Sequence, residues 1–200
     1  RVSGCADALQ KLQPDLLLVL GDRYEIFAAV QAALIARIPV AHIAGGDLTA
    51  GAYDDALRHS ITKMAHIHFT THAAATRRVR QMGEHPEHIH NVGSPALDLL
   101  RSMTLLERDA LEHELDIKLR ARNLLITFHP VTLDTLPSAN QFEEVLDALK
   151  VLGNDTGLFL TYPNADDGGR ALARRLENFV ANRDNAVAFQ SLGQLRYWSL

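Results

Sequence analysis

Three polar stretches follow apolar runs, and the first is Gly21-Asp22-Arg23 after Leu16–Leu20. Ligands of open α/β sheets bind at the carboxyl ends of the strands, so Asp22 is expected at the ligand edge. The adjacent Arg23 can hold a phosphate or steer the carboxylate. The alternative is that Asp22 only caps the next helix, a common position for Asp. Taken alone, this stretch favours the cap.

The second stretch, Ala44–Gly51, is glycine-rich and contains Asp47. Paired glycines allow a close approach of backbone to ligand, but the loop has neither P-loop nor GxGxxG spacing. Asp54 and Asp55 follow, and acids at a helix start usually complement its dipole. Arg58 and His59 lie one turn on, so acids, a cation and an imidazole come together. An ion pair between Arg58 and Asp54, four residues apart, is the simpler account.

The third stretch is Thr127-Phe128-His129-Pro130-Val131-Thr132. A His at a strand end, facing a cleft between domains, can titrate near neutral pH and serve as acid or base. The segment 162–166 (Tyr-Pro-Asn-Ala-Asp) occupies the equivalent end of the next strand.

Metal binding and nucleophilic catalysis are both poorly supported. The only cysteine, Cys5, falls in a predicted helix, and no GxSxG elbow occurs. Two groups of histidines lack Cys or carboxylates at a familiar ligand spacing, so we expect no metal and interpret them as surface or core-edge residues. The groups are His66, His68 and His72, and His85, His88 and His90.

The elements that must position these loops alternate between strand-like and helical patterns, which predicts an α/β fold. We expect parallel sheets with helices on both faces and two Rossmann-like domains, 1–98 and 123–200, joined by a bridge at 99–122. Strands are predicted at 16–20, 40–44, 66–70, 88–92, 124–128, 157–161 and 186–189. Helices are predicted at 1–13, 24–38, 54–65, 73–82, 105–119, 141–152 and 170–180, with an amphipathic stretch at 192–200.

Composition excludes several classes of partner. The net charge of −4 and a pI near 6.2 argue against nucleic acid. The one basic cluster, Arg77, Arg78 and Arg80, is interpreted as a solvated helix face. No apolar run approaches the ~20 residues that cross a bilayer. A single cysteine suits a reducing compartment, so a cytoplasmic location is expected. Both ends look cut, since Arg1 opens inside a predicted helix and Leu200 ends one.

Taken together, the loops closely resemble one enzyme family, the hydrolysing UDP-N-acetylglucosamine 2-epimerases of sialic- and legionaminic-acid synthesis. The strings that carry the resemblance are Gly-Asp-Arg-Tyr-Glu (21–25), His-Ile-Ala-Gly-Gly-Asp (42–47) and Asp-Asp-Ala-Leu-Arg-His-Ser-Ile-Thr-Lys (54–63). The similarity continues in order at 79–84, 92–98, 128–132 and 162–166.

The resemblance implies two Rossmann-like domains facing a cleft, a GT-B-like architecture, both incomplete here. It also implies hydrolysis of the sugar–UDP bond with inversion at C2. Anti elimination of UDP gives a 2-acetamidoglucal, and syn hydration gives an N-acetylmannosamine-type sugar. No metal or nicotinamide cofactor is needed. The partners implied are a UDP-sugar substrate and further copies of the chain, since the family generally forms homodimers or tetramers.

The family's functional residues carry over by position. Asp47 ends the His-Ile-x-Gly-Gly-Glu loop, with Asp in place of the commoner Glu, and His129 matches the Thr-x-His-Pro histidine. The implied catalytic residues are Asp22, Asp47, Asp54, Asp55 and His129. The implied positioning or substrate-binding residues are Arg23, Arg58, His59 and Asn164.

The main departure from the family's pattern is at the two ends of the chain. The family's first strand should precede Arg1 and its phosphate-gripping Gly-Asn-Ser-Ser motif should follow Leu200, so the chain alone is expected to be inactive and poorly stable. Asp47 and Gly93-Ser94-Pro95 lean slightly toward the UDP-N,N'-diacetylbacillosamine (legionaminic) branch. Because a fold does not fix a function, two rival functions stay open. One is a GT-B glycosyltransferase, which would need an acceptor, and the second is a catalytically dead sugar-nucleotide-binding subunit.

Overall fold

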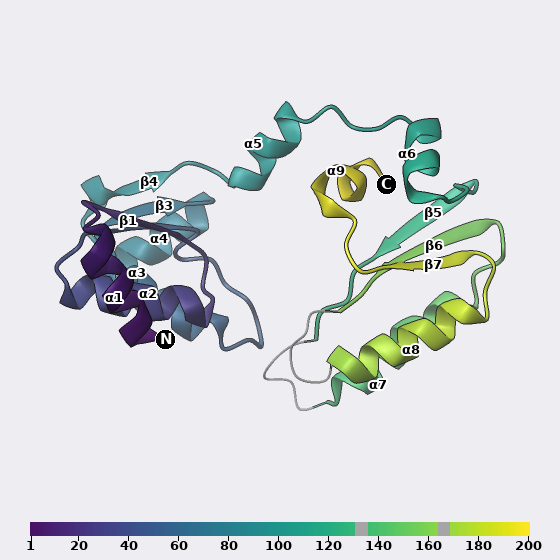
Figure 1. The fold of residues 1–200 in the computed structure, drawn as a ribbon, viewed down its shortest axis with the longest axis horizontal. Helices are drawn as coiled ribbons and strands as arrows, with labels where there is room; N and C mark the ends of the chain where they lie inside the picture. Colours follow the sequence, from purple (N-terminus) through teal and green to yellow (C-terminus); the bar gives the residue numbers. More distant parts are fainter. Residues whose placement is uncertain (131–135, 164–168) are drawn as a thin grey trace. The chain divides into compact units, whose positions relative to one another are not determined.

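The computed structural model describes residues 1–130, 136–163 and 169–200, and it forms two compact units (Figure 1). Unit 1 is Arg1–Arg101 and unit 2 is Ser102–Leu200. Their boundary falls inside the segment 99–122 that the sequence assigns to a bridge, and the bridge itself stays a prediction. Asn164 and the end of the Thr127–Thr132 stretch lie outside the described residues.

Unit 1 contains a four-stranded parallel sheet in the order β1-β2-β3-β4. Its strands are β1 (Leu17–Leu20), β2 (Val40–Ile43), β3 (Ile67–Thr70) and β4 (Ile89–Asn91). Its helices are α1 (Val2–Leu12), α2 (Tyr24–Ile35), α3 (Asp54–Met64), α4 (Ala73–Gln81) and α5 (Pro95–Ser102), with a short 3-10 helix η1 (Pro86–His88).

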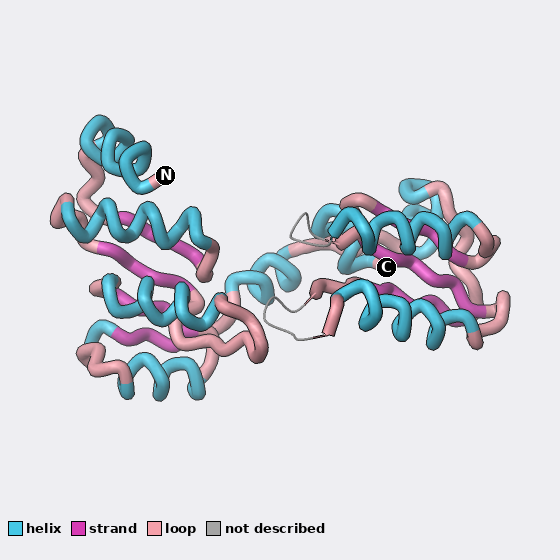
Figure 2. Tube along the Cα trace, turned by 90° about the horizontal axis from the view of Figure 1, so that it is seen from below, coloured by secondary structure: helices cyan, strands magenta, loops and turns pink. Residues whose placement is uncertain are grey.

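All connecting helices of unit 1 lie on one face of its sheet, as Figures 1 and 2 show for α1–α4. Consecutive strands are neighbours, so right-handed crossovers return every helix to the same side. Val19 faces these helices and is 8% exposed, whereas Leu18 and Leu20 on the other face are 58% and 56% exposed. The prediction of helices on both faces is therefore wrong for unit 1.

The core of unit 1 explains how closely α2 and α3 approach the sheet. Val30, Val40 and Ile61 are completely buried. The small side chains of Ala32 and Ala33 on α2 are also buried against this cluster, which lets the helix lie close to the strands. This packing fixes the start of α3 near the carboxyl ends of β1 and β2.

Unit 2 contains a three-stranded parallel sheet in the order β5-β6-β7. Figure 1 shows α7 and α8 on one side of this sheet, and α6 and α9 on the other. Phe159 on the central strand is accordingly 2% exposed. Its strands are β5 (Arg122–Ile126), β6 (Thr156–Thr161) and β7 (Ala186–Phe189). Its helices are α6 (Arg108–Leu115), α7 (Ser138–Lys150), α8 (Gly169–Ala181) and α9 (Gly193–Ser199).

The helix predicted at 105–119 is shorter than expected. It ends at Leu115 because Asp116 adopts a left-handed conformation with φ of 51°. The carboxylate of Glu112 then accepts from the backbone N–H of Leu119 at 3.0 Å, which holds the chain after the helix. In the part of the chain that the structure describes, no helix is long and apolar enough to cross a membrane.

Candidate active site

Arg58, in the second turn of α3, makes the densest set of polar contacts in unit 1 and is 5% exposed. Its Nη1 donates to the Asp55 carboxylate and to the Asp47 carbonyl oxygen, each at 2.8 Å. Its Nη2 donates to the Asp22 carboxylate, and to the Thr49 hydroxyl at 2.9 Å. We call this set the Arg58 cluster. Charge-assisted bonds of this kind fix both position and orientation.

The Arg58 cluster corrects two interpretations of the sequence. Arg58 pairs with Asp55, three residues earlier, instead of with Asp54. Both spacings share a helix face, and Asp55 also accepts from the Thr49 N–H at 2.8 Å, which orients it toward the loop. Asp22 does not cap α2, because Arg23 is the N-cap residue and the Asp22 carboxylate turns to Arg58.

Asp54 lies beside this cluster without sharing its bonds. Burial raises the pKa of its carboxyl group, and the neighbouring carboxylate of Asp22 raises it further, while Arg58 opposes the change. Among residues 1–130, 136–163 and 169–200, no hydrogen bond or ion pair holds the Asp54 carboxylate. A carboxyl group with a raised pKa next to an ion-paired carboxylate is an arrangement suited to acid–base chemistry.

The glycine-rich loop after β2 is held at several points. The Nη1 of Arg78 donates to the carbonyl oxygen of Gly46, so Arg78 does not belong to a fully solvated face, although Arg77 and Arg80 are exposed. Gly46 has φ of +82°, and a Cβ there would lie 2.6 Å from the Ala75 carbonyl oxygen. Only glycine fits this position, so the loop's close approach to α4 depends on it.

The carboxylate of Asp47 points toward the start of α4 and away from Arg58. Its Oδ1 accepts from the Thr71 hydroxyl at 2.6 Å and lies 3.3 Å from Nε2 of His72. Asp47 therefore joins the Arg58 cluster through its backbone carbonyl alone. Its predicted catalytic role stays a prediction, and the structure separates its side chain from those of Asp22 and Asp55.

Two other predicted site residues lie outside the cluster. Nδ1 of His59 donates to the carbonyl oxygen of Asp55 in its own helix. Arg23 has a 61% exposed side chain and contacts Glu25 at 3.4 Å. The structure thus brings together Asp22, Asp55 and Arg58, with Asp54 beside them, and it does not bring in His59 or Arg23.

The carboxyl ends of β5–β7 form a pocket of about 410 Å³, which we call the unit 2 pocket. His129 lines it and is exposed. The Thr127 hydroxyl lies 3.2 Å from the Tyr197 hydroxyl and accepts from Thr161 at 3.0 Å. Trp198, 43% exposed, meets the Tyr197 ring edge-on with centroids 6.0 Å apart. Aromatic faces beside hydroxyl groups suit a planar, polar ligand.

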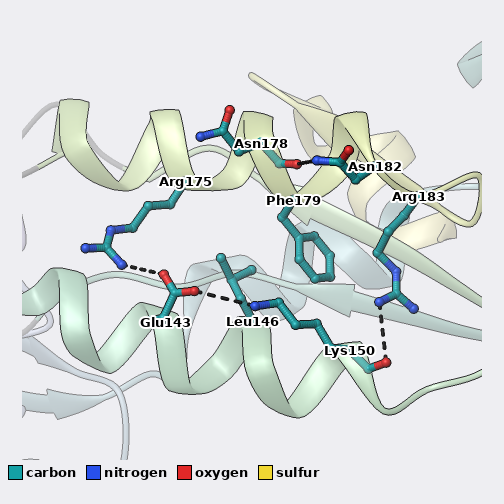
Figure 3. Close-up of a pocket in the computed structure, with 8 residues that line it drawn as sticks. All are labelled: Glu143, Leu146, Lys150, Arg175, Asn178, Phe179, Asn182 and Arg183. Carbon is teal, nitrogen blue, oxygen red and sulfur yellow. Dashed lines mark hydrogen bonds and ion pairs between the residues drawn. The ribbon is translucent and has the colours of Figure 1, made fainter.

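A second hollow in unit 2, of about 390 Å³, lies between α7 and α8 (Figure 3). Glu143 pairs with Arg175 and, at 3.6 Å, with Lys150. Arg183 donates to the Leu152 carbonyl oxygen at 2.9 Å and lies over the Phe179 ring. Its lining includes the carboxyl ends of both helices, the edge opposite the strands' carboxyl ends. We therefore interpret this hollow as a helix–helix groove laced by ion pairs.

The histidines do not gather into a metal site in the described part of the chain, where no three His, Cys, Asp or Glu side chains stand close enough to hold an ion. His68 is buried and bound to Glu84 at 3.2 Å. His66 accepts from the Val40 N–H at 3.3 Å.

Several residues that hold the site are not predicted from the sequence. They are Thr49, Thr71 and Arg78 around the loop, and Thr127, Thr161, Tyr197 and Trp198 in the unit 2 pocket. A single threonine in a loop or at a strand end carries no spacing signal, and Tyr197 and Trp198 are part of the predicted amphipathic stretch 192–200. Only their contacts in the folded structure reveal them.

The chain is similar in sequence to known proteins over its whole length. A family model described as UDP-N-acetylglucosamine 2-epimerase matches residues 1–200. The chain is 38% identical over 199 residues to the GDP/UDP-N,N'-diacetylbacillosamine 2-epimerase (hydrolyzing) of Campylobacter jejuni, covering 99% of this chain and 52% of that protein. It is also 38% identical over 165 residues to polysialic acid biosynthesis protein P7 of Escherichia coli, covering 82% and 42%.

A solved structure agrees on the fold. The UDP-GlcNAc 2-epimerase of Neisseria meningitidis, bound to UDP-GlcNAc, superposes with a TM-score of 0.77 at 20% identity, covering 98% of this chain and 54% of that one. The two parallel α/β units therefore match about half of a GT-B-like structure, which confirms the predicted fold class. The chain spans about half the length of these relatives. On the family match over its whole length, the chain belongs to the UDP-N-acetylglucosamine 2-epimerase family.

Proposed function

We propose that the complete protein is a hydrolysing 2-epimerase that acts on UDP-N-acetylglucosamine or its diacetamido-trideoxy analogue and releases UDP and a manno-configured sugar. The observation that carries this proposal is the Arg58 cluster. It sets an ion-paired carboxylate, Asp22, next to Asp54, whose pKa is raised, at the carboxyl edge of the unit 1 sheet. The description of the family and the name of the Campylobacter jejuni relative support the substrate class.

The chemistry requires one proton to leave the sugar and one to return. A base takes the C2 proton, the C1–O bond to UDP breaks with its electrons going to the phosphate, and a glycal forms. Water then adds its hydroxyl to C1, and C2 gains a proton on that same face, which is opposite to the face that lost the first proton, so C2 is inverted. Two carboxyl groups in different environments can divide these tasks.

We assign the first task to Asp22 and the second to Asp54. The pairing of Asp22 with Arg58 holds the Asp22 carboxylate in one position and orientation, which a base requires. Burial raises the pKa of Asp54, which favours its protonated form, so of the two carboxyl groups we assign to Asp54 the delivery of a proton in the hydration step. Asp55 completes the charge around Arg58 and is a positioning group in this scheme.

The nucleotide half of the substrate is proposed to occupy the unit 2 pocket. The exposed indole of Trp198 offers a stacking surface for a base, and the hydroxyls of Thr127 and Thr161 offer hydrogen bonds. His129 lines the same pocket and is proposed to donate to a phosphate oxygen of the leaving UDP.

The test is UDP release by the complete protein without added metal or acceptor, with UDP-N-acetylglucosamine and the diacetamido-trideoxy analogue in parallel. NMR identifies the sugar product. We expect UDP together with a manno-configured sugar from one of the two substrates, which also fixes the branch. UDP release that requires an acceptor sugar would contradict the proposal and support a glycosyltransferase.

A further inference from the structure

His42, the third residue of β2, is completely buried and bonded at both ring nitrogens. Its Nε2 lies 2.8 Å from the carbonyl oxygen of Gly21, and its Nδ1 lies 3.2 Å from the hydroxyl oxygen of Thr62. The first contact reaches the turn after β1, and the second reaches α3. One side chain thus joins the two segments that supply the Arg58–Asp22 ion pair.

The protonation state of this imidazole follows from its partners. A carbonyl oxygen only accepts, so Nε2 carries the hydrogen and donates it to Gly21. Burial lowers the pKa of His42 to about 4, so the ring is neutral at physiological pH. Nδ1 is then an acceptor, and the Thr62 hydroxyl is the group that donates to it.

Gly21, in the turn that carries Asp22, is bonded to β2 through both its N–H and its carbonyl oxygen. The N–H of Gly21 donates to the carbonyl oxygen of Ile43 at 3.0 Å, and its carbonyl oxygen accepts from His42 at 2.8 Å. Gly21 has φ of +81°, a conformation that lets the chain turn sharply before Asp22. The direction of the Asp22 carboxylate therefore depends on where the Gly21 carbonyl is held.

The same ring is tied to the helix that carries Arg58. The Thr62 hydroxyl also faces the carbonyl oxygen of Arg58 at 2.9 Å, one turn earlier in α3, so its single hydrogen is shared between that carbonyl oxygen and Nδ1 of His42. The loop after β2 leaves room for this contact, since a Cβ on Gly45 would lie 3.0 Å from both His42 Nδ1 and Thr62 Oγ1. A side chain at position 45 would push the pair apart.

We propose that His42 is a positioning residue for the reaction, holding Asp22 and Arg58 in register through Gly21 and Thr62. The kinetic test of this inference rests on the proposed function. Its spectroscopic test rests on the geometry alone. The competing account is that His42 is an ordinary core histidine whose loss would only destabilise the fold.

The chain supplies a matched control. His68 lies beside His42 on β3 in the same register and is 1% exposed. Its Nε2 contacts Glu84 at 3.2 Å, and no contact joins it to the turn at Gly21 among the described residues. Replacing either histidine empties a similar buried volume, but only His42 touches the turn that carries Asp22.

Three variants of the complete protein separate the two accounts. His42→Gln places an amide N–H close to the position of Nε2, so it can keep the bond to Gly21. His42→Asn reaches only as far as Nδ1 and loses that bond. His68→Asn is the control for loss of a buried histidine. Each variant is measured for kcat, KM, melting temperature, and the NMR shifts of the Gly21 carbonyl carbon and Asp22 amide.

We expect His42→Asn to lower kcat about 100-fold with KM within about threefold, because a misplaced reacting group costs rate more than binding. His42→Gln should recover kcat to within about fivefold of the parent. The Gly21 and Asp22 resonances should move in His42→Asn and stay in place in His42→Gln and His68→Asn.

Two results would overturn the proposal. One is a kcat for His42→Asn no lower than that of His68→Asn at equal loss of melting temperature. The other is Gly21 and Asp22 resonances that do not move in His42→Asn. If the unaltered protein released no UDP from either sugar, the proposed function would fail, and the Gly21 and Asp22 resonances would still decide whether His42 holds the turn.

Discussion

The two sheets carry their polar side chains differently at their carboxyl edges. In unit 1 a guanidinium that is 5% exposed binds two carboxylates, a hydroxyl and a carbonyl oxygen. In unit 2 an exposed His129 lines a pocket whose other side chains include hydroxyls and aromatic rings and carry no charge. The first edge is charged and cross-linked by ion pairs, and the second is an open pocket that is mostly uncharged.

Under the proposed function, this difference predicts a different task for each of the two edges. Charges fixed before the substrate arrives stabilise a transition state without reorganisation, which suits the chemical step. An open pocket with stacking surfaces and hydroxyls suits recognition of a nucleoside, where contacts are made on binding. Variants in unit 1 should therefore act mainly on kcat, and variants in unit 2 mainly on KM.

The largest effect is expected from Arg58→Met. It leaves the partly buried carboxylates of Asp22 and Asp55 without their cation, so stability should fall by about 3 kcal/mol and kcat by more than about 1000-fold. Denaturant unfolding and UDP release measure the two effects. The matched variant in unit 2 is Arg175→Met, which breaks a pair with Glu143 whose side chains are 39% and 40% exposed. It should cost less than about 1 kcal/mol. Equal losses in the two variants would contradict the contrast between the buried Arg58 cluster and an exposed ion pair.

Asp54→Asn should lower kcat by about 100- to 1000-fold, because the amide cannot deliver a proton. The same substitution should lower kcat without lowering the stability of the fold. Burial raises the folded pKa of Asp54, so the stability that this group contributes is greatest at low pH and is lost as pH rises through that pKa. The Asn variant should therefore be at least as stable as the parent at pH 7. A clear loss of stability there would show that the ionised carboxylate has a partner. Asp7→Asn, on the exposed side of α1, is the control.

The pH dependence of stability should come largely from His42. Its pKa is lowered from 6.5 to about 4, chiefly by burial, with His68 and Arg58 lowering it and Gly21 and Asp22 raising it. The unfolded chain therefore binds the proton more tightly, so the stability is present above pH 6.5 and is lost as pH falls toward 4. The shift corresponds to about 3 kcal/mol.

His42→Gln should remove most of this acid sensitivity in urea titrations at several pH values. Because burial also lowers the pKa of His68, part of the slope should remain in that variant. The exposed His129→Gln is the control from unit 2. A slope unchanged in His42→Gln would mean that this imidazole does not control the acid sensitivity.

The smallest effect is expected in the unit 2 pocket. Trp198→Ala should raise KM about tenfold through loss of a stacking surface, with kcat within about twofold. Trp198→Phe should keep most of the affinity. Steady-state UDP release gives both constants. A fall in kcat with an unchanged KM would contradict a purely binding role for this edge.

The sequence predicts the elements of this fold well where both ends of a run are marked. The strand Ala186–Phe189 is found with its predicted bounds, and α2 begins at Tyr24 as expected. The faces of the unit 1 sheet could not be predicted, because periodicity does not reveal the order of strands. Leu18 and Leu20 read as buried on both sides, yet one face carries them exposed.

The sequence predicts which residues lie at the candidate site, but it does not predict which of them are bonded to each other. Polar residues at strand ends were expected, and Asp22, Asp55 and Arg58 do meet there. The contact between Arg58 and Asp22 spans 36 residues, so no local spacing signals it. His42 was overlooked as a site residue because a histidine inside an apolar run reads as part of the core.

The most direct test is the fate of the C2 hydrogen when the complete protein acts on its UDP-sugar in deuterated water. NMR of the sugar product shows whether deuterium has entered at C2. The account predicts a manno-configured product deuterated at C2, formed with UDP, and about 100-fold less of it per unit time from Asp22→Asn. UDP release with the original C2 hydrogen retained would confine the reaction to C1, and it would contradict the assignment of proton transfer to the Arg58 cluster.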